Sequence, residues 1–265
     1  MKSLKDYSGL WGVLSVALLL ICIISWADGF SLFGIALKPA PIAERLTREP
    51  ERPDVGASVA LKQIALLPVE KRLVADTTSH SILIFGDSML EGLNRRLGAY
   101  AKENGHTLNS VIWYSSTTKT WAECDTLRHY LRRFKPTYVF ISLGGNELFI
   151  RGIIESRDRY VKKILKELGD IPYVWIGPPN WKEDTGINEL IANNVPAGRF
   201  FVSNGMKFDR QKDGAHPTYE SAAVWFDSIA RWMPLHADHP IRMRRPNSSA
   251  PGRPATVVAL QPPTN

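Results

Sequence analysis

Apolar, strand-like runs alternate with amphipathic, helix-like stretches through the centre of this 265-residue chain. The strand-like runs lie at 81–85, 108–113, 137–143, 173–176 and 200–203. The helix-like stretches lie at 89–104, 122–134, 155–168, 184–193 and 219–233. Repeated strand-then-helix order predicts a parallel sheet covered by helices on both faces. Because crossovers in such sheets are right-handed, the loops that follow the strands meet at one edge, where open α/β sheets bind their ligands.

Three short polar motifs fall in loops of this kind. Gly-Asp-Ser at 86–88 follows the first strand-like run, Gly-Gly-Asn at 144–146 the third, and Asp-Gly-Ala-His at 213–216 the last. We therefore expect the three motifs to form one site at the carboxyl edge of the sheet.

The residue types in these motifs are those of a serine hydrolase. Ser88 is the candidate nucleophile, His216 the general base that accepts its proton, and Asp213 the carboxylate that orients the imidazole. The side-chain amide of Asn146 and the backbone N–H of Ser88 are candidate oxyanion donors. Taken singly, each motif also fits a plain structural role, such as a helix cap at Ser88 or a turn at Asn146.

Taken together and in this order, the motifs resemble those of the SGNH hydrolase superfamily, also called GDSL-type esterases. The resemblance spans about 81–234 and is carried by Gly-Asp-Ser-Met-Leu at 86–90, Gly-Gly-Asn-Glu at 144–147 and Asp-Gly-Ala-His-Pro at 213–217. It implies a flavodoxin-like, three-layer α/β/α sandwich with a parallel sheet of about five strands and a Ser-His-Asp triad.

Two positions depart from the pattern of the superfamily. Its second motif usually contains a glycine whose N–H is a third oxyanion donor, but 113–118 contains none. Ser115 or Ser116 takes that place, with Ser116 as the candidate donor. Glu147 stands where the superfamily usually has aspartate, and we expect this change to matter little because that acid is not part of the triad.

Five further residues of these loops are candidate contacts to substrate. Aromatic faces stack on sugar rings, although aromatic side chains also simply fill cores. The candidates are Asp87, Trp113, Tyr114, Gly145 and Trp181.

The N-terminal part of the chain predicts export. Residues 10–26 form a nearly unbroken apolar run, and a run of about 17 to 20 such residues can cross a bilayer. Lys2 and Lys5 precede the run and favour a cytoplasmic amino end. The alternative is a signal peptide cleaved after Ala27.

We accordingly divide the chain into five parts. These are a cytoplasmic N-terminus at 1–9, a transmembrane anchor at 10–27, a linker with a possible helix at 28–74, the catalytic domain at 75–238 and a disordered Pro- and Arg-rich tail at 239–265.

Charge and ligand patterns narrow the partners. The formal net charge is +7, but four of the basic residues, Arg242, Arg244, Arg245 and Arg253, lie in the tail. This distribution does not favour nucleic acid as a partner. The histidines show no convincing metal-ligand spacing, so we expect neither a metal nor an organic cofactor.

These observations favour a membrane-anchored serine esterase on the periplasmic or extracellular side of the cytoplasmic membrane. We expect it to remove small acyl groups, acetyl above all, from cell-envelope or extracellular polysaccharide. The first alternative is a polysaccharide O-acetyltransferase, in which a sugar hydroxyl replaces water and a membrane-embedded protein supplies the acyl group. The second is a non-catalytic glycan-binding module.

Overall fold

The computed structural model describes residues 31–32, 35–36, 74–247 and 252–262. The chain divides into two compact units, Met1–Val69 and Glu70–Asn265. In the first unit, β1 (Ser31–Leu32) pairs antiparallel with β2 (Ile35–Ala36). The predicted segments 1–9 and 10–27, and most of 28–74, lie outside the described residues. Within the described residues, no helix is both long and apolar enough to span a membrane.

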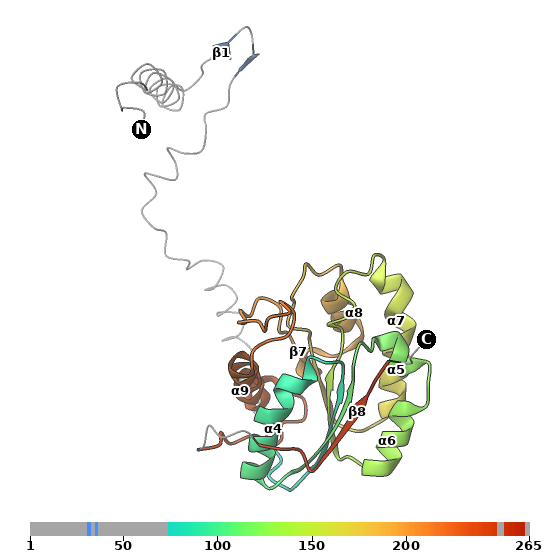
Figure 1. The fold of residues 1–265 in the computed structure, drawn as a ribbon, viewed down its shortest axis with the longest axis vertical. Coiled ribbons are helices and arrows are strands. Elements are labelled where there is room, and N and C mark those ends of the chain that lie inside the picture. Colours follow the sequence, from blue (N-terminus) through green and yellow to red (C-terminus); the bar gives the residue numbers. More distant parts are fainter. Residues whose placement is uncertain (1–30, 33–34, 37–73, 248–251, 263–265) are drawn as a thin grey trace, which may run out of the picture. The chain divides into compact units, whose positions relative to one another are not determined.

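The second unit is built on a six-stranded sheet in which every pairing is parallel. The order of the strands is β7-β6-β5-β3-β4-β8 (Figure 1). Their bounds are β3 (Ser81–Gly86), β4 (Thr107–Trp113), β5 (Tyr138–Ser142), β6 (Tyr173–Ile176), β7 (Phe200–Phe201) and β8 (Thr256–Leu260). The chain moves from β3 outward to β4 and then returns to β5 on the other side of β3. This reversal makes the β3–β5 boundary the switch point, where a ligand crevice is expected.

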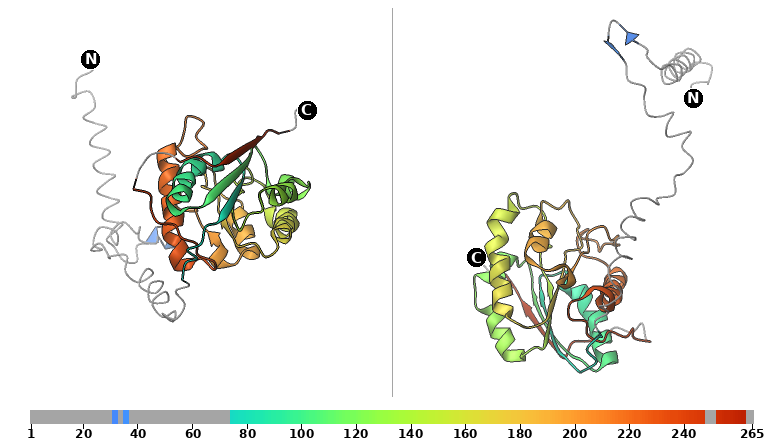
Figure 2. Two further views of the ribbon diagram at one scale, coloured as in Figure 1. Left: turned by 90° about the horizontal axis from the view of Figure 1, so that it is seen from below. Right: turned by 180° about the vertical axis from the view of Figure 1, so that it is seen from behind.

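Helices cover both faces of this sheet (Figures 1 and 2). One layer contains α4 (Leu90–Asn104) and α9 (Tyr219–His236). The other layer contains α5 (Thr118–Ala122), α6 (Thr126–Phe134), α7 (Ile153–Leu168) and α8 (Ile187–Asn194), and the 3₁₀ helix η3 (Ala197–Arg199) precedes β7. The predicted three-layer α/β arrangement is confirmed.

Burial on both faces explains why the sequence of strand β3 is apolar throughout. Ile82 and Ile84 pack into the core under α4 and α9, whereas Leu83 and Phe85 pack into the core under the other helices. A strand buried on both faces has no solvent side, so it reads as a continuous apolar run.

The expected helix at 122–134 is two shorter helices. Thr117 caps α5 through its side chain and forms a reciprocal capping box with Thr120, so the first helix begins well before residue 122. It ends at Ala122, and α6 begins at Thr126.

The prediction of a disordered tail at 239–265 is wrong for the part of the tail that the structure describes. Strand β8 pairs with β4 along five residues, from Asn109 opposite Thr256 to Trp113 opposite Leu260. The sheet therefore has six strands rather than about five. The prediction failed because Pro and Arg dominate the composition of the tail and obscure the short run Thr-Val-Val-Ala-Leu, which becomes ordered by pairing with β4.

Polar contacts hold the tail before it reaches the sheet. The Asn104 side chain at the end of α4 donates to the Arg244 carbonyl at 2.8 Å and accepts from the Arg244 N–H at 2.9 Å. Further on, Gly252 passes directly over α4, and a Cβ on it would lie 1.9 Å from the Ala99 nitrogen. Only glycine permits this crossing, which leads the chain to β8.

Candidate active site

Ser88 lies immediately after β3, at the switch point of the sheet. Gly86 ends the strand so close to β5 that a Cβ would lie 1.8 Å from the Ser142 carbonyl oxygen. The Asp87 N–H donates to that same oxygen at 3.0 Å. The turn that presents Ser88 is thus fixed by backbone contact between β3 and β5, and α4 begins two residues later at Leu90.

Ser88, His216 and Asp213 form a continuous chain of hydrogen bonds. His216 Nε2 lies 2.8 Å from Ser88 Oγ, and His216 Nδ1 lies 2.7 Å from Asp213 Oδ2. The three residues come from two loops separated by more than a hundred positions of sequence. In this arrangement the imidazole can accept a proton from the serine while the carboxylate holds its other nitrogen.

The Asp213 carboxylate is stabilised in its charged form. Its Oδ1 accepts hydrogen bonds from the Ala215 N–H at 2.8 Å and from the His216 N–H at 3.0 Å. The Ala215 N–H and the His216 side chain and N–H lower the pKa of Asp213 to about 2. Asp213 is therefore ionised throughout the neutral pH range.

The loop that carries Asp213 and His216 is a tight hairpin over residues 209–218. The Thr218 N–H donates to the Asp209 carbonyl, the Gln211 N–H donates to the His216 carbonyl, and Gly214 turns the chain with a φ of 70°. Thr218 then caps α9 by accepting from the Ser221 N–H at 3.2 Å. The hairpin thus ends in a helix start, which attaches its base to α9.

Asp87 and Gly145 do not face a substrate, which corrects two of the predicted contacts. The Asp87 side chain is buried, and it accepts from the Met89 N–H and from the Gly145 N–H, each at 3.0 Å. Burial raises the pKa of Asp87 to about 7, against the lowering effect of these two hydrogen bonds. Asp87 instead ties the nucleophile turn to the loop that carries Asn146.

The oxyanion side of the site differs from the prediction at Ser116. The Ser116 N–H donates to the Trp113 carbonyl at 3.2 Å, so it is already used inside the turn. The Ser116 carbonyl accepts from Asn146 Nδ2 at 3.0 Å, so Ser116 holds Asn146 in place. Because an amide nitrogen carries two protons, Asn146 keeps one for another acceptor.

Two backbone N–H groups of the motif loops have no acceptor among the residues that the structure describes. No described residue accepts from the N–H of Ser88 or of Ser115. Ser115 is exposed and has a φ of 59°, the left-handed conformation that favours glycine. The chain thus keeps a left-handed turn at this place without a glycine, and Ser115 is the serine of the pair whose N–H is available.

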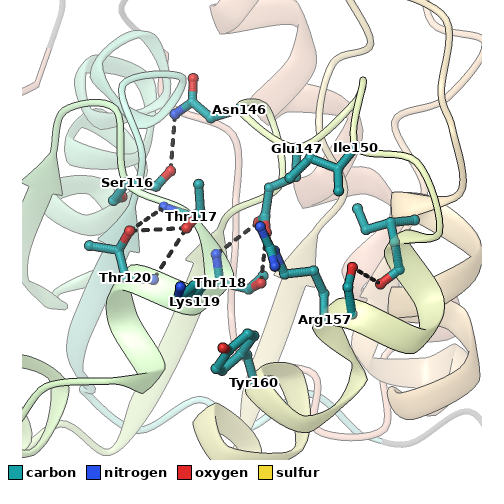
Figure 3. A network of polar contacts seen from close by, with 12 residues as sticks. Ser116, Thr117, Thr118, Lys119, Thr120, Asn146, Glu147, Ile150, Arg157 and Tyr160 are labelled. Atoms are coloured by element: carbon teal, nitrogen blue, oxygen red, sulfur yellow. Dashed lines mark hydrogen bonds and ion pairs between the residues drawn. The ribbon is translucent and has the colours of Figure 1, made fainter.

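Glu147 contributes more than the sequence indicated. Figure 3 shows its carboxylate between Thr118 and Arg157. It accepts from the Thr118 N–H and hydroxyl, each at 2.8 Å, and from Arg157 Nε at 3.1 Å. Burial of Glu147 raises its pKa, while the bonds from Thr118 and Arg157 favour the charged form. Glu147 thereby joins the Asn146 loop to the start of α5 and to α7, a connection that no sequence spacing revealed.

The three predicted aromatic contacts, Trp113, Tyr114 and Trp181, are all half-buried and pack against the core. Trp113 packs edge-on against the buried Trp121, with ring centroids 5.5 Å apart. Trp181 Nε1 donates to the Gly145 carbonyl at 2.9 Å, and Lys182 Nζ lies 4.8 Å from the centre of its ring.

No three His, Cys, Asp or Glu side chains of the described residues gather closely enough to hold a metal ion. The arrangement at Ser88 supplies a nucleophile, a base and hydrogen-bond donors from the protein itself.

No protein-family model and no curated protein matches this chain. Several solved structures are similar in part, and three of them serve as examples. TesA has 20% identity and a TM-score of 0.45 over 58% of this chain and 98% of its own. The esterase EstA from Pseudoalteromonas sp. has 18% identity and a TM-score of 0.41 over 57% and 97%. A family 3 carbohydrate esterase from Clostridium thermocellum has 18% identity and a TM-score of 0.43 over 60% and 100%. At such values the likeness carries no assignment of activity.

Proposed function

We propose that this chain is a serine esterase that works through an acyl-enzyme. The observation that carries the proposal is the relay in which Ser88 Oγ, His216 and Asp213 follow one another at 2.8 and 2.7 Å. Ser88 Oγ attacks the ester carbonyl carbon while His216 Nε2 takes the hydroxyl proton. The tetrahedral intermediate then collapses, the ester C–O bond breaks, and His216 returns the proton to the departing alcohol.

The negative oxygen of the intermediate requires donors aimed at it. The Ser88 N–H, the remaining amide proton of Asn146 and the Ser115 N–H are the candidates that this geometry leaves free. Removing one such donor from a serine hydrolase typically costs about 100-fold to 1000-fold in rate.

In the second half of the reaction, His216 deprotonates a water molecule that attacks the acyl-enzyme. The acid leaves, and Ser88 regains its proton from His216. A sugar hydroxyl in place of that water would make the same site an O-acyltransferase. The test below identifies which of the two accepts the acyl group.

For the substrate, we propose acetyl or other small acyl esters on polysaccharide. The triad is open to solvent: the side chains of His216 and Asp213 are 30% and 47% exposed. An open site admits a bulky polymer as the alcohol part of the ester. The apolar run at 10–26 and the lysines before it support an enzyme that is anchored in the cytoplasmic membrane and acts on the periplasmic or extracellular side.

The test is ester hydrolysis by the purified full-length chain and by Ser88→Ala, first on p-nitrophenyl acetate and then on an O-acetylated oligosaccharide. Ser228→Ala is the matched control, because the bonds of that hydroxyl stay within α9: it donates to the Val224 carbonyl and accepts from Arg231. We expect Ser88→Ala to lose at least about 1000-fold in kcat and the control to keep the wild-type rate.

Hydrolysis that persists in Ser88→Ala, or a folded wild-type protein without turnover, would overturn the proposal. Acetyl groups that appear on an added unacetylated oligosaccharide would make the protein a transferase. Free acetate alone would make it an esterase.

A further inference from the structure

We propose that Arg210 is the positioning residue that keeps His216 in register with Ser88. The inference rests on the proposed function and concerns how its triad is assembled. The guanidinium of Arg210 bonds three backbone carbonyls from two loops. It donates from Nη1 to Ala215 at 2.6 Å and from Nη2 to Pro179 and Asn180, each at 2.9 Å.

The need for such a residue follows from the hairpin at 209–218. No strand of the six-stranded sheet runs through it, and its backbone bonds join its own two arms. At its base, the Asp209 N–H donates to Ser221 Oγ at 3.0 Å. Bonds within the hairpin define its shape, but they do not set the position of its tip relative to Ser88.

Arg210 supplies a connection near the tip of the hairpin, in addition to the bonds that join its base to α9. Ala215 is the residue directly before His216, so the bond to its carbonyl lies next to the imidazole. Pro179 and Asn180 belong to the loop between β6 and α8. A single side chain therefore joins the acid-base hairpin to a second loop at the same edge of the sheet.

That second loop is itself well fixed. The Asn188 side chain donates to Asn180 Oδ1 at 3.2 Å and to Asp184 Oδ2 at 2.7 Å. Asp184 also accepts from the N–H groups of Gly186 and Ile187 at the start of α8. Arg210 thus attaches the hairpin to a loop that the first turn of a helix holds in place.

Hydrogen bonds link the loops around the site into a closed ring. Asp87 ties the nucleophile turn to the Gly145 loop, and Trp181 Nε1 ties the Gly145 carbonyl to the loop between β6 and α8. Arg210 joins that loop to the hairpin, and His216 returns to Ser88. Among these links, only that of Arg210 reaches the hairpin from the oxyanion side.

The chemistry of arginine suits this task. Its planar fork can bond several carbonyls at once in fixed directions, whereas an ammonium is a compact charge on a flexible stem. The Phe208 ring lies 5.0 Å from Arg210 Cζ. Partial burial lowers the pKa of Arg210, and the nearby Asp213 charge opposes that lowering, so the group remains a cation and donates throughout.

The test compares Arg210→Ala, Arg210→Gln and Arg210→Lys in the full-length chain with wild type. Lys212→Ala is the matched control, because it removes an exposed cation from the same hairpin. The readouts are kcat and KM for p-nitrophenyl acetate, the rate at which a fluorophosphonate labels Ser88, and the unfolding midpoint in urea. Methylguanidinium at millimolar concentration is added to Arg210→Ala.

Displacing a catalytic group by about 1 Å can cost on the order of 100-fold, so we expect Arg210→Ala to lose about 10-fold to 100-fold in kcat. KM should stay within about twofold, because Arg210 bonds protein carbonyls and not substrate. Labelling of Ser88 should slow in parallel, methylguanidinium should restore part of the rate, and Lys212→Ala should match wild type. Arg210→Lys gives the same comparison with the charge kept, should Arg210→Ala fail to fold.

An Arg210→Ala or Arg210→Lys variant that keeps kcat and the labelling rate within about twofold of wild type would overturn the inference. So would a loss of kcat that follows only the unfolded fraction and does not respond to methylguanidinium. A wild-type chain that labels at Ser88 but hydrolyses no ester would overturn the proposed function alone. In that case the labelling rates of the variants still decide the role of Arg210.

Discussion

The buried Asp87 makes the stability of this protein depend on pH in an unusual direction. Its carboxyl group is fully enclosed and accepts hydrogen bonds from the N–H groups of Met89 and Gly145. Because burial raises its pKa from 3.8 to about 7, the folded protein holds a proton that the unfolded chain has released across this range. Proton binding by Asp87 therefore stabilises the folded protein relative to the unfolded chain. This stabilisation is fully present below pH 3.8 and is lost as the pH rises through about 7.

The pKa shift of Asp87 sets the size of the change in the free energy of unfolding. About three pKa units at roughly 1.4 kcal/mol each correspond to about 4 kcal/mol over the full range. Between about pH 4.5 and pH 8, about 3 kcal/mol of this difference falls within reach of experiment. Asp87→Asn removes the titration and leaves an amide whose NH₂ group faces one of the two backbone donors. We expect that unpaired N–H to cost about 1 to 3 kcal/mol at low pH.

The assay is urea unfolding of wild type and Asp87→Asn at half-unit steps of pH, followed by tryptophan fluorescence. Trp121, Trp175 and Trp225 are buried and report the loss of the fold. From pH 4.5 to pH 8, we expect the stability of Asp87→Asn to rise by about 3 kcal/mol relative to wild type, so that its destabilisation disappears or reverses sign. Wild type and Asp87→Asn both contain groups such as Asp213 and His106, so the titration of those groups cancels in the difference between the two free energies of unfolding. A difference that stays constant over this range would refute the account of Asp87.

Two further predictions concern the sheet. Gly86→Ala places a Cβ 1.8 Å from the Ser142 oxygen, so β3 and β5 must separate at the site. We expect the free energy of unfolding in urea to fall by more than about 4 kcal/mol. The control is Gly105→Ala, at a left-handed glycine, which should lower it by about 1 to 2 kcal/mol. A Gly86→Ala protein as stable as Gly105→Ala would contradict that close approach. Ending the chain at residue 251 removes β8 and should cost about 2 to 4 kcal/mol, whereas ending it at Leu260 should cost little, with both measured by urea midpoint. Equal midpoints for the two truncations would show that β8 contributes no stability.

The interpretation of the central part of the chain succeeded where local pattern and tertiary structure impose the same demand. Strands buried on both faces must be apolar throughout, and this run of residues is visible in any single sequence. The order of strands and helices then places the loops that carry Ser88, Asn146 and His216 at one edge. For that reason the fold class and the grouping of the three motifs could be predicted from the residues alone.

The interpretation failed where the structure depends on partners that are distant in sequence. Strand β8 becomes a strand only beside β4, so composition classified its segment as a disordered tail. The two adjacent serines are indistinguishable as residue types, yet the Ser116 N–H is used within the turn while that of Ser115 is free. Asp87 lies in one of the motif loops and was expected to contact a substrate, but its partners are backbone N–H groups inside the protein.

The sequence by itself determined which groups are available for chemistry and at which edge of the sheet they gather, because strand periodicity and loop position are local properties. Only the tertiary structure decided how those groups are held. The links made by Asp87, Glu147 and Arg210 each join segments that the sheet brings together from different parts of the chain. Such contacts leave no spacing or periodicity in the sequence, because the distance between their partners is set by the packing of the strands and not by the chain between them.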